Sequence, residues 1–435
     1  MVEGTYSFRT WDALLAGEEA ERALAAVDAI AASLAALPRP TTAEAETAQY
    51  GALSIPSFAG GHAGYALFYA CLHQHRPDEG FDEQALAHLD LAIQLLSSAQ
   101  TLPNLYSGFT GVAWTVEHLK DLLDLDQDDD LNADIDQALY EHLGQSPWQR
   151  PYDLISGLAG YGVYALKRLP RPLAVKCLER VVDRLAELAV ERPEGVTWHT
   201  PADHLWPETR KDFPDGYYNL GVAHGVPGVV AVLAQICAAG VARAKAQPLL
   251  EGAVSWILGQ RLERGDDSAF PYQVTNDGAT KTARAAWCYG DPGIACALLV
   301  AARAIGEPAW ENEAIELARL SATRPQSTTR IVDACLCHGA VGLGHLLNRC
   351  HQATGDELLG ERARFWLREA LKLRRSGEGF GGYIAWDLGA GGEMEWLAVP
   401  GFLTGATGVG LALLAAATSH DPRWDEVLLV SPVLS

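Results

Sequence analysis

Residues 223–239 read AHGVPGVVAVLAQICAA, a Gly-x-x-Gly motif followed by an apolar run, and this pattern occurs seven times along the chain. The motifs begin at Gly61, Gly108, Gly157, Gly225, Gly290, Gly339 and Gly405. Their spacings are 47, 49, 68, 65, 49 and 66 residues, close to either 48 or 66. A regular series of similar segments indicates a repeat architecture.

The runs that follow the motifs are apolar on almost every side, which is typical of helices buried all round. Between them lie amphipathic stretches typical of surface helices, at 18–37, 83–97, 172–190, 245–258, 310–320 and 357–373. A flat solenoid cannot bury a helix on every side, whereas a closed ring can. We therefore predict an all-α fold, an α/α toroid of seven inner and seven outer helices forming one domain over residues 1–435. The extra residues of the longer intervals should be loops, notably 193–220.

Composition excludes several classes of protein. The chain has 435 residues, of which 49% are hydrophobic, enough for a large core, so disorder is excluded. Acidic residues number 55 against 33 Lys and Arg, a net charge of −22. Such a surface repels phosphate backbones and anionic lipids, so we expect neither nucleic acid nor membrane as a partner.

The chain also carries no evident targeting signal. Its first residues, MVEGTYSFRTWDALLAGEEAE, lack the basic and apolar regions of a signal peptide. The longest apolar runs fall short of the ~20 residues that cross a bilayer, so we expect a cytoplasmic protein. Eight cysteines are too few for a disulfide scaffold in a chain of this length. If a cysteine has a functional role, we expect it to be a metal ligand or a nucleophile rather than half of a disulfide.

Parallel inner helices that start at the motifs would bring the residues before each motif to one end of the ring. Cys288 and Cys337 each precede a motif by two residues, and His338 follows Cys337. Two thiolates and one imidazole suit tetrahedral Zn²⁺ and leave its fourth position for water or substrate. We predict one catalytic zinc per chain at these residues. A buried cysteine is otherwise a small hydrophobe, the reading we favour for the other six, although Cys335 stays open because it lies two residues from Cys337.

Two further residues precede motifs and could take part in proton transfer. His224 directly precedes Gly225, and an imidazole with a pKa near 6.5 exchanges protons at neutral pH. Its alternative role is that of a hydrogen-bonded structural histidine. Asp153, four residues before Gly157, could equally be a helix N-cap.

Three segments together resemble the lanthionine synthetase C family: WCYGDPG at 287–293, CHG at 337–339 and AHGVPG at 223–228. The resemblance extends over nearly the whole chain and implies an α/α toroid with a catalytic zinc. It implies the zinc ligands Cys288, Cys337 and His338, and the catalytic residues His224, Asp153, Arg284 and Tyr289. Taken alone, Arg284 could be an ordinary loop cation and Tyr289 could pack the mouth of the ring. The first motif departs from the family pattern at His62, where an aliphatic residue is usual.

The resemblance also implies a reaction, the addition of a peptide Cys thiol to dehydroalanine or dehydrobutyrine to form a (methyl)lanthionine ring. Zinc would deprotonate the thiol, His224 would act as the acid with Asp153 orienting it, and Arg284 could stabilise the enolate. The expected partners are a dehydrated precursor peptide and a separate dehydratase, since no part of the chain resembles a dehydratase domain. Two alternatives stay open: addition of glutathione or another small thiol to dehydrated residues, and a non-catalytic, zinc-stabilised peptide-binding module.

Overall fold

The computed structural model describes residues 11–38, 55–97, 101–126, 130–263, 267–278, 280–389 and 391–431, and within these ranges it is mostly helical, with 14 substantial helices. Seven of them are the apolar helices that follow the motifs: α4 (His62–His75), α6 (Phe109–Leu122), α8 (Leu158–Lys167), α11 (Val226–Ala238), α13 (Asp291–Ile305), α15 (Ala340–Thr354) and α17 (Ala406–Ala417). The first glycine of every motif is the residue immediately before one of these helices.

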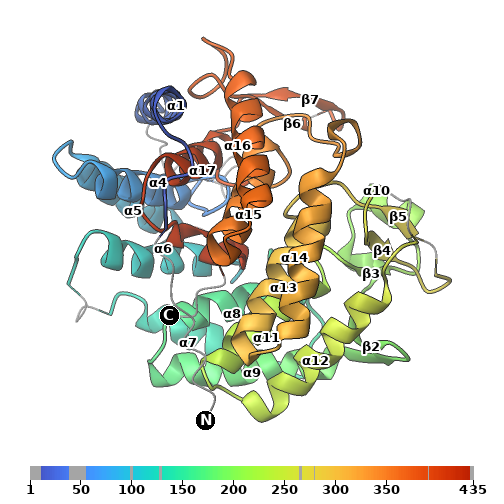
Figure 1. The fold of residues 1–435 in the computed structure, drawn as a ribbon. Coiled ribbons are helices and arrows are strands. Elements are labelled where there is room, and N and C mark those ends of the chain that lie inside the picture. Colours follow the sequence, from blue (N-terminus) through green and yellow to red (C-terminus); the bar gives the residue numbers. More distant parts are fainter. Residues whose placement is uncertain are drawn as a thin grey trace.

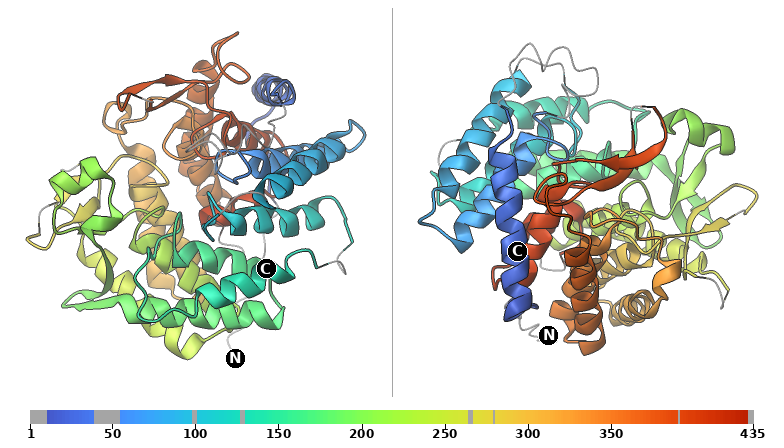
Figure 2. Two further views of the ribbon diagram at one scale, coloured as in Figure 1. Left: turned by 180° about the vertical axis from the view of Figure 1, so that it is seen from behind. Right: turned by 90° about the horizontal axis from the view of Figure 1, so that it is seen from above.

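These seven inner helices contact one another in a closed circuit. Each contacts the next along the chain, from α4 to α17, and α17 contacts α4. Figures 1 and 2 show the chain running around the molecule in this order, until the red α17 lies beside the blue α1 and α4. Almost every residue of α11 and α17 is buried, as the apolar runs predicted.

The other seven helices are more amphipathic and lie outside this circuit. They are α1 (Glu18–Ala35), α5 (Phe81–Ser97), α7 (Ala133–His142), α9 (Pro172–Leu188), α12 (Arg243–Gly259), α14 (Pro308–Thr323) and α16 (Glu357–Lys372). Most pack on the inner helix that precedes them, whereas α1 packs on α17. The Trp11 indole nitrogen and the Leu14 amide donate to the Ala415 and Ala416 carbonyls, both at 2.8 Å, which holds the segment before α1 against the last inner helix.

The expectation of an all-α fold is wrong in one respect, because the described residues include two small sheets. One has the antiparallel order β1-β2-β3-β4-β5, and the other pairs β6 with β7. Their strands are β1 (Ala189–Arg192), β2 (Gly195–Thr200), β3 (Tyr217–Asn219), β4 (Pro271–Val274), β5 (Thr280–Thr282), β6 (Ala385–Leu388) and β7 (Met394–Leu397). All lie in the three longer intervals.

The extra residues of the longer intervals are thus not simply loops, as 193–220 shows. This segment contains β2, β3, a 3₁₀ turn at Ala202–His204 and the short helix α10 (Pro207–Asp212). Figure 1 shows the five-stranded sheet and α10 together at one side of the ring. Strands of only three to six residues give almost no periodic signal, and their partners lie in other segments, so the pairing is decided by tertiary structure.

The second glycine of every motif, and the first glycine of the six motifs from Gly108 to Gly405, lies where a Cβ would overlap the preceding loop. A Cβ on Gly111 would lie 1.9 Å from the carbonyl oxygen of Leu105, and one on Gly408 would lie 1.9 Å from that of Phe402. The second glycine of each of the other five motifs has the same close approach to the carbonyl six residues earlier. Only glycine leaves room for this contact, which explains the repeated Gly-x-x-Gly.

Adjacent loops are joined through the residue two positions before the first glycine. At this position the amide of one loop donates to the carbonyl of the equivalent residue in the next: Ala59 to Tyr106 (2.9 Å), Ile155 to Ala223 (3.3 Å), Cys288 to Cys337 (3.4 Å) and Cys337 to Leu403 (2.9 Å). The loops therefore meet at one end of the inner helices, as the sequence predicted. Cys288 and Cys337 are equivalent residues of adjacent loops.

None of the helices in the described ranges is long and apolar enough to cross a bilayer. The first ten residues, which bear on the expected absence of a signal peptide, lie outside the described ranges.

Candidate active site

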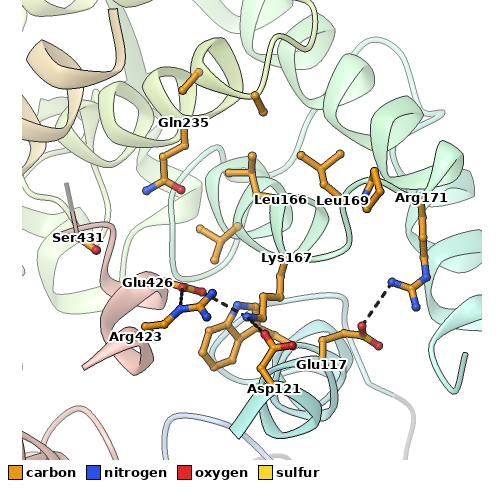
Figure 3. Close-up of a pocket in the computed structure, with 15 residues that line it drawn as sticks. Glu117, Asp121, Leu166, Lys167, Leu169, Arg171, Gln235, Arg423, Glu426 and Ser431 are labelled. Atoms are coloured by element: carbon orange, nitrogen blue, oxygen red, sulfur yellow. Dashed lines mark hydrogen bonds and ion pairs between the residues drawn. The ribbon is translucent and has the colours of Figure 1, made fainter. Parts of the chain in front are cut away.

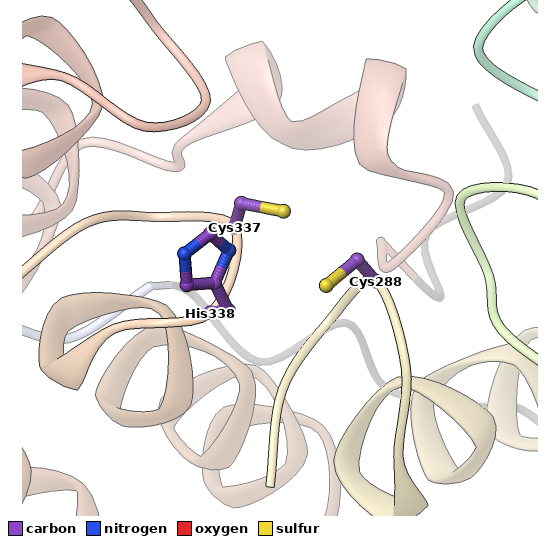
Figure 4. A group of neighbouring side chains, drawn as sticks. All are labelled: Cys288, Cys337 and His338. Atoms are coloured by element: carbon purple, nitrogen blue, oxygen red, sulfur yellow. The ribbon is translucent and has the colours of Figure 1, made fainter. Parts of the chain in front are cut away.

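Cys288, Cys337 and His338 come together where the loops before α13 and α15 meet. Their sulfur and imidazole nitrogen atoms all lie within 4.8 Å of one another. Figure 4 shows the two sulfur atoms pointing toward each other, with the imidazole of His338 beside them. Two thiols and one imidazole gathered in this way are the soft donor set that zinc prefers, so the side chains present fit a metal of this kind.

The two thiols differ in their acidity. Cys288 forms a hydrogen bond with Cys337, and this bond holds the pKa of the Cys288 thiol well below its usual value despite burial. His338 and Arg284 lower the pKa of Cys288 further. The same contact raises the pKa of Cys337 well above its usual value, and burial adds to the effect. Arg284, predicted as a site residue, therefore lies close enough for its charge to act on this group.

Asp333 is a member of this neighbourhood that the sequence analysis missed. Its buried carboxylate accepts hydrogen bonds from the Cys335 amide at 3.1 Å and from the Trp386 amide in β6 at 2.9 Å. Ligand atoms of Asp333, Cys335 and His338 also lie within 4.8 Å of one another. The sequence does contain a signal for Asp333, because it precedes Gly339 by six residues, and Arg284, a predicted site residue, precedes Gly290 by the same number.

His224 and Asp153 form a second group at the same end of the inner helices. The Nδ1 atom of His224 lies 2.5 Å from Oδ2 of Asp153, and Oδ1 of Asp153 accepts the Ser156 amide at 2.8 Å. Asp153 therefore satisfies a backbone amide before α8, as a capping residue would, and also faces the imidazole. Burial alone would lower the pKa of His224, but the Asp153 carboxylate raises it above the usual value, and the charge of Cys288 raises it further.

A cavity of about 410 Å³ opens beside this pair and is lined by Asp153, His224 and Tyr289. The ring of Tyr289 stacks near that of His224, with centroids 6.4 Å apart, and its hydroxyl accepts from Asn219 at 3.3 Å. Burial raises the pKa of Tyr289 well above its usual value, so its hydroxyl stays protonated. Tyr289 directly follows Cys288, so one loop carries both a metal ligand candidate and a wall of the cavity.

The other aromatic residues of this cavity were not predicted from the sequence. Tyr152, Trp206 and Tyr217 also line it, two of them from the 193–220 segment. Aromatic residues in a segment expected to be a loop gave no indication of which cavity they would face.

A second cavity, of about 550 Å³, contains none of the predicted site residues. It lies at the opposite ends of α6, α8 and α11, and its charged side chains are paired with one another (Figure 3). Lys167, for example, contacts Asp121 at 3.0 Å and Glu426 at 3.6 Å. The predicted residues thus gather at one end of the inner helices.

A family model described as lanthionine synthetase C-like protein matches residues 56–429. The chain belongs to this family. It is 24% identical to the nisin biosynthesis protein NisC of Lactococcus lactis subsp. lactis over 320 residues, which cover 68% of this chain and 73% of that protein. A solved structure of a nisin cyclase superposes with a TM-score of 0.72 at 20% identity, covering 93% of this chain and 96% of that one.

The likeness to the nisin cyclase structure shows that the two proteins share a fold. Cys288, Cys337 and His338 form a candidate metal group that is consistent with the zinc site of such cyclases. His62, where the first motif departs from the family pattern, is not part of this candidate metal group. Its Nδ1 atom is 2.8 Å from Nδ1 of His88 in α5, and the two rings stack.

Proposed function

We propose that this protein is a zinc-dependent lanthipeptide cyclase, which adds peptide Cys thiols to dehydroalanine or dehydrobutyrine and forms (methyl)lanthionine rings. One observation carries the proposal: a Cys/His metal group and a His–Asp pair lie at the same end of the inner helices, joined by Cys288 and Tyr289 in one loop. The first group suits thiol activation and the second suits proton transfer.

Cys288, Cys337 and His338 would hold the zinc. When bound, zinc would supply Lewis acidity that keeps a substrate thiol deprotonated at neutral pH. In the addition, a bond forms between sulfur and the β-carbon, the C=C π bond breaks, and one proton reaches the α-carbon. No leaving group and no oxidant are needed.

The residues of this chain would control where the proton and the negative charge go. Asp153 keeps Nδ1 of His224 occupied, so the other ring nitrogen is free to serve the substrate, and the raised pKa of His224 favours the protonated imidazole. The guanidinium of Arg284 would stabilise charge on the enolate oxygen. Asn219 and the cavity wall around Tyr289 would orient the peptide.

The test uses a synthetic peptide with one dehydroalanine and one Cys, given to the wild type and to His224→Ala. General acids contribute about 10²–10⁴-fold, so ring closure should slow by this order while the metal is retained. Free thiols are counted over time, because cyclisation does not change the mass, and lanthionine diastereomers are separated after hydrolysis. His420→Ala, a change at an exposed histidine, is the matched control.

The stereochemistry gives a second readout. A proton delivered from one fixed face sets a single α-carbon configuration, so the His224 variant should give a mixture of diastereomers. Wild-type rate and a single diastereomer from this variant would show that another group delivers the proton. In the same assay, addition of glutathione to the peptide in preference to ring closure would favour the small-thiol alternative, and no reaction by the zinc-loaded wild type would favour a binding module.

A further inference from the structure

The hairpin of β6 and β7 exposes an apolar face. Trp386 lies opposite Trp396, and Leu388 opposite Met394, so all four side chains project from the same face. Leu388 is 61% exposed and Met394 47%, and the two Trp rings lie 5.2 Å apart. The guanidinium carbon of Arg375 lies 4.9 Å from the centroid of the Trp396 ring, so the open part of the apolar face is centred on Leu388 and Met394. An exposed apolar face of this kind is typical of a binding surface.

The outer edge of β7 is open to another strand. The amide of Gly389 donates to the Glu393 carbonyl at 2.8 Å, so the alternation of an antiparallel ladder directs the amides of Met394 and Trp396 away from β6. Within the described residues no third strand pairs with this hairpin. On the other edge, by contrast, the Trp386 amide is bound by Asp333.

The opposite face of the hairpin is acidic. Asp387 lies directly across from Glu395, an arrangement that is destabilising for like charges. In the described part of the chain neither carboxylate forms an ion pair with Lys or Arg, although Asp387 accepts a hydrogen bond from the neighbouring Leu388 amide at 2.8 Å. A strand added beside β7 would relieve this repulsion if it placed a Lys or Arg over this face.

The hairpin is also tied to the candidate metal group. Asp333 binds the Trp386 amide with one carboxylate oxygen and the Cys335 amide with the other, and it lies beside His338. Figure 1 shows β6 and β7 at the periphery of the molecule, near α16. A peptide held on β7 would thus be anchored on an element fixed directly to the loop that carries Cys337 and His338.

We propose that β7 binds an extended segment of the peptide substrate as a third strand, with apolar side chains against Trp386, Leu388, Met394 and Trp396 and basic side chains over Asp387 and Glu395. The identity of the occupant rests on the proposed function, which requires a peptide substrate. Main-chain hydrogen bonds would supply affinity, and the alternation of apolar and basic residues would supply specificity.

The experiment measures binding by fluorescence anisotropy on the full-length, zinc-loaded protein. The probe is a fluorescein-labelled peptide of eight alternating Val and Lys residues, and the comparison peptide alternates Val and Glu. Neither contains Cys or a dehydrated residue, so binding is separate from catalysis. We expect the Val-Lys peptide to bind about tenfold or more tightly than the Val-Glu peptide, because charge sign on the acidic face distinguishes them.

Two variants test the edge and the charge independently. Met394→Pro removes an outward amide at the first residue of β7, a position where proline is tolerated, and should weaken binding about fivefold or more. Met394→Val, its matched control, keeps the amide and should stay within about twofold. Glu395→Lys leaves one carboxylate and one ammonium group on this face, so the preference for the Val-Lys peptide should disappear.

Equal binding of the Val-Lys peptide to the wild type and Met394→Pro, or an unchanged preference in Glu395→Lys, would overturn the proposal. A wild-type dimer in sedimentation velocity that Met394→Pro converts to a monomer would overturn it too, by assigning the edge to a second copy of the chain. If the probe binds as expected but the wild type closes no rings, the proposed function fails while the hairpin site stands.

Discussion

Replacing Asp153 by Asn tests whether its carboxylate sets the acidity of His224. The substitution keeps a similar shape and an oxygen near Nδ1 of the imidazole, 2.5 Å from the carboxylate in the wild type, but removes the negative charge. Burial, which lowers the pKa of His224, would then be opposed only by more distant charges such as that of Cys288. The pKa of His224 should therefore fall.

The size of the shift follows from the contact and its exposure. A hydrogen bond to a charged group contributes about 1.5–3 kcal/mol. The His224 side chain is 40% exposed, so solvent screening brings the expected loss to the lower end of this range. Since about 1.4 kcal/mol is a factor of ten in an equilibrium constant, kcat/KM on the alkaline limb should fall by roughly tenfold.

The assay is the pH dependence of kcat/KM for ring closure of the single-Cys, single-dehydroalanine peptide. A general acid works only while protonated, so activity should decline as the pH rises through the pKa of His224. Because the Asp153 carboxylate raises the pKa of His224, the wild type stays active to higher pH, and in Asp153→Asn the alkaline limb should move to lower pH. Asp121→Asn, at the other end of α6 and in contact with Lys167, is the matched control.

An alkaline limb that stays in place in Asp153→Asn, with metal content and helical signal unchanged, would refute the assignment of this pair. A shift toward higher pH would do so as well, because it would mean that the limb does not report an acid stabilised by Asp153.

Two other predictions concern the metal and the ring. Wild-type protein should contain about one zinc per chain by atomic emission, and Cys337→Ala should lose most of it; full retention in both Cys288→Ala and Cys337→Ala would exclude the site. In urea unfolding, Gly111→Ala should lose roughly 3 kcal/mol or more, because its Cβ would overlap the Leu105 carbonyl. Gly306→Ala, at φ +76° with open space around it, should lose only about 1 kcal/mol, and equal losses would contradict this reading.

The sequence predicted the helical framework because one local signal was repeated. Each motif places a glycine against a carbonyl six residues earlier and then starts a buried helix, and both requirements act within about twenty residues. Six of the seven outer helices were also placed closely, because each has an amphipathic period, whereas α7 (Ala133–His142) was not located from the sequence. The segment 357–373, for instance, is observed as Glu357–Lys372.

The repeat also allowed Cys288, Cys337 and His338 to be predicted as neighbours. Equivalent positions in adjacent repeats must lie close together if the helices form a ring, and the amide of Cys288 does donate to the carbonyl of Cys337. Asp153 and His224 were predicted to converge on the same argument, and their 2.5 Å contact agrees with it. Their roles in a reaction stay predictions.

The sequence by itself therefore determined the features that depend on local periodicity and its repetition. These are the inner helices, six of the outer helices and the end of the ring where the site lies. Only the tertiary structure decided the strand pairing in the longer intervals, the aromatic wall that the 193–220 segment adds to the cavity, and the link from Asp333 to Trp386. The physical reason is that these contacts join segments far apart in the chain. A short strand or a single carboxylate carries no local mark of the partner it will meet.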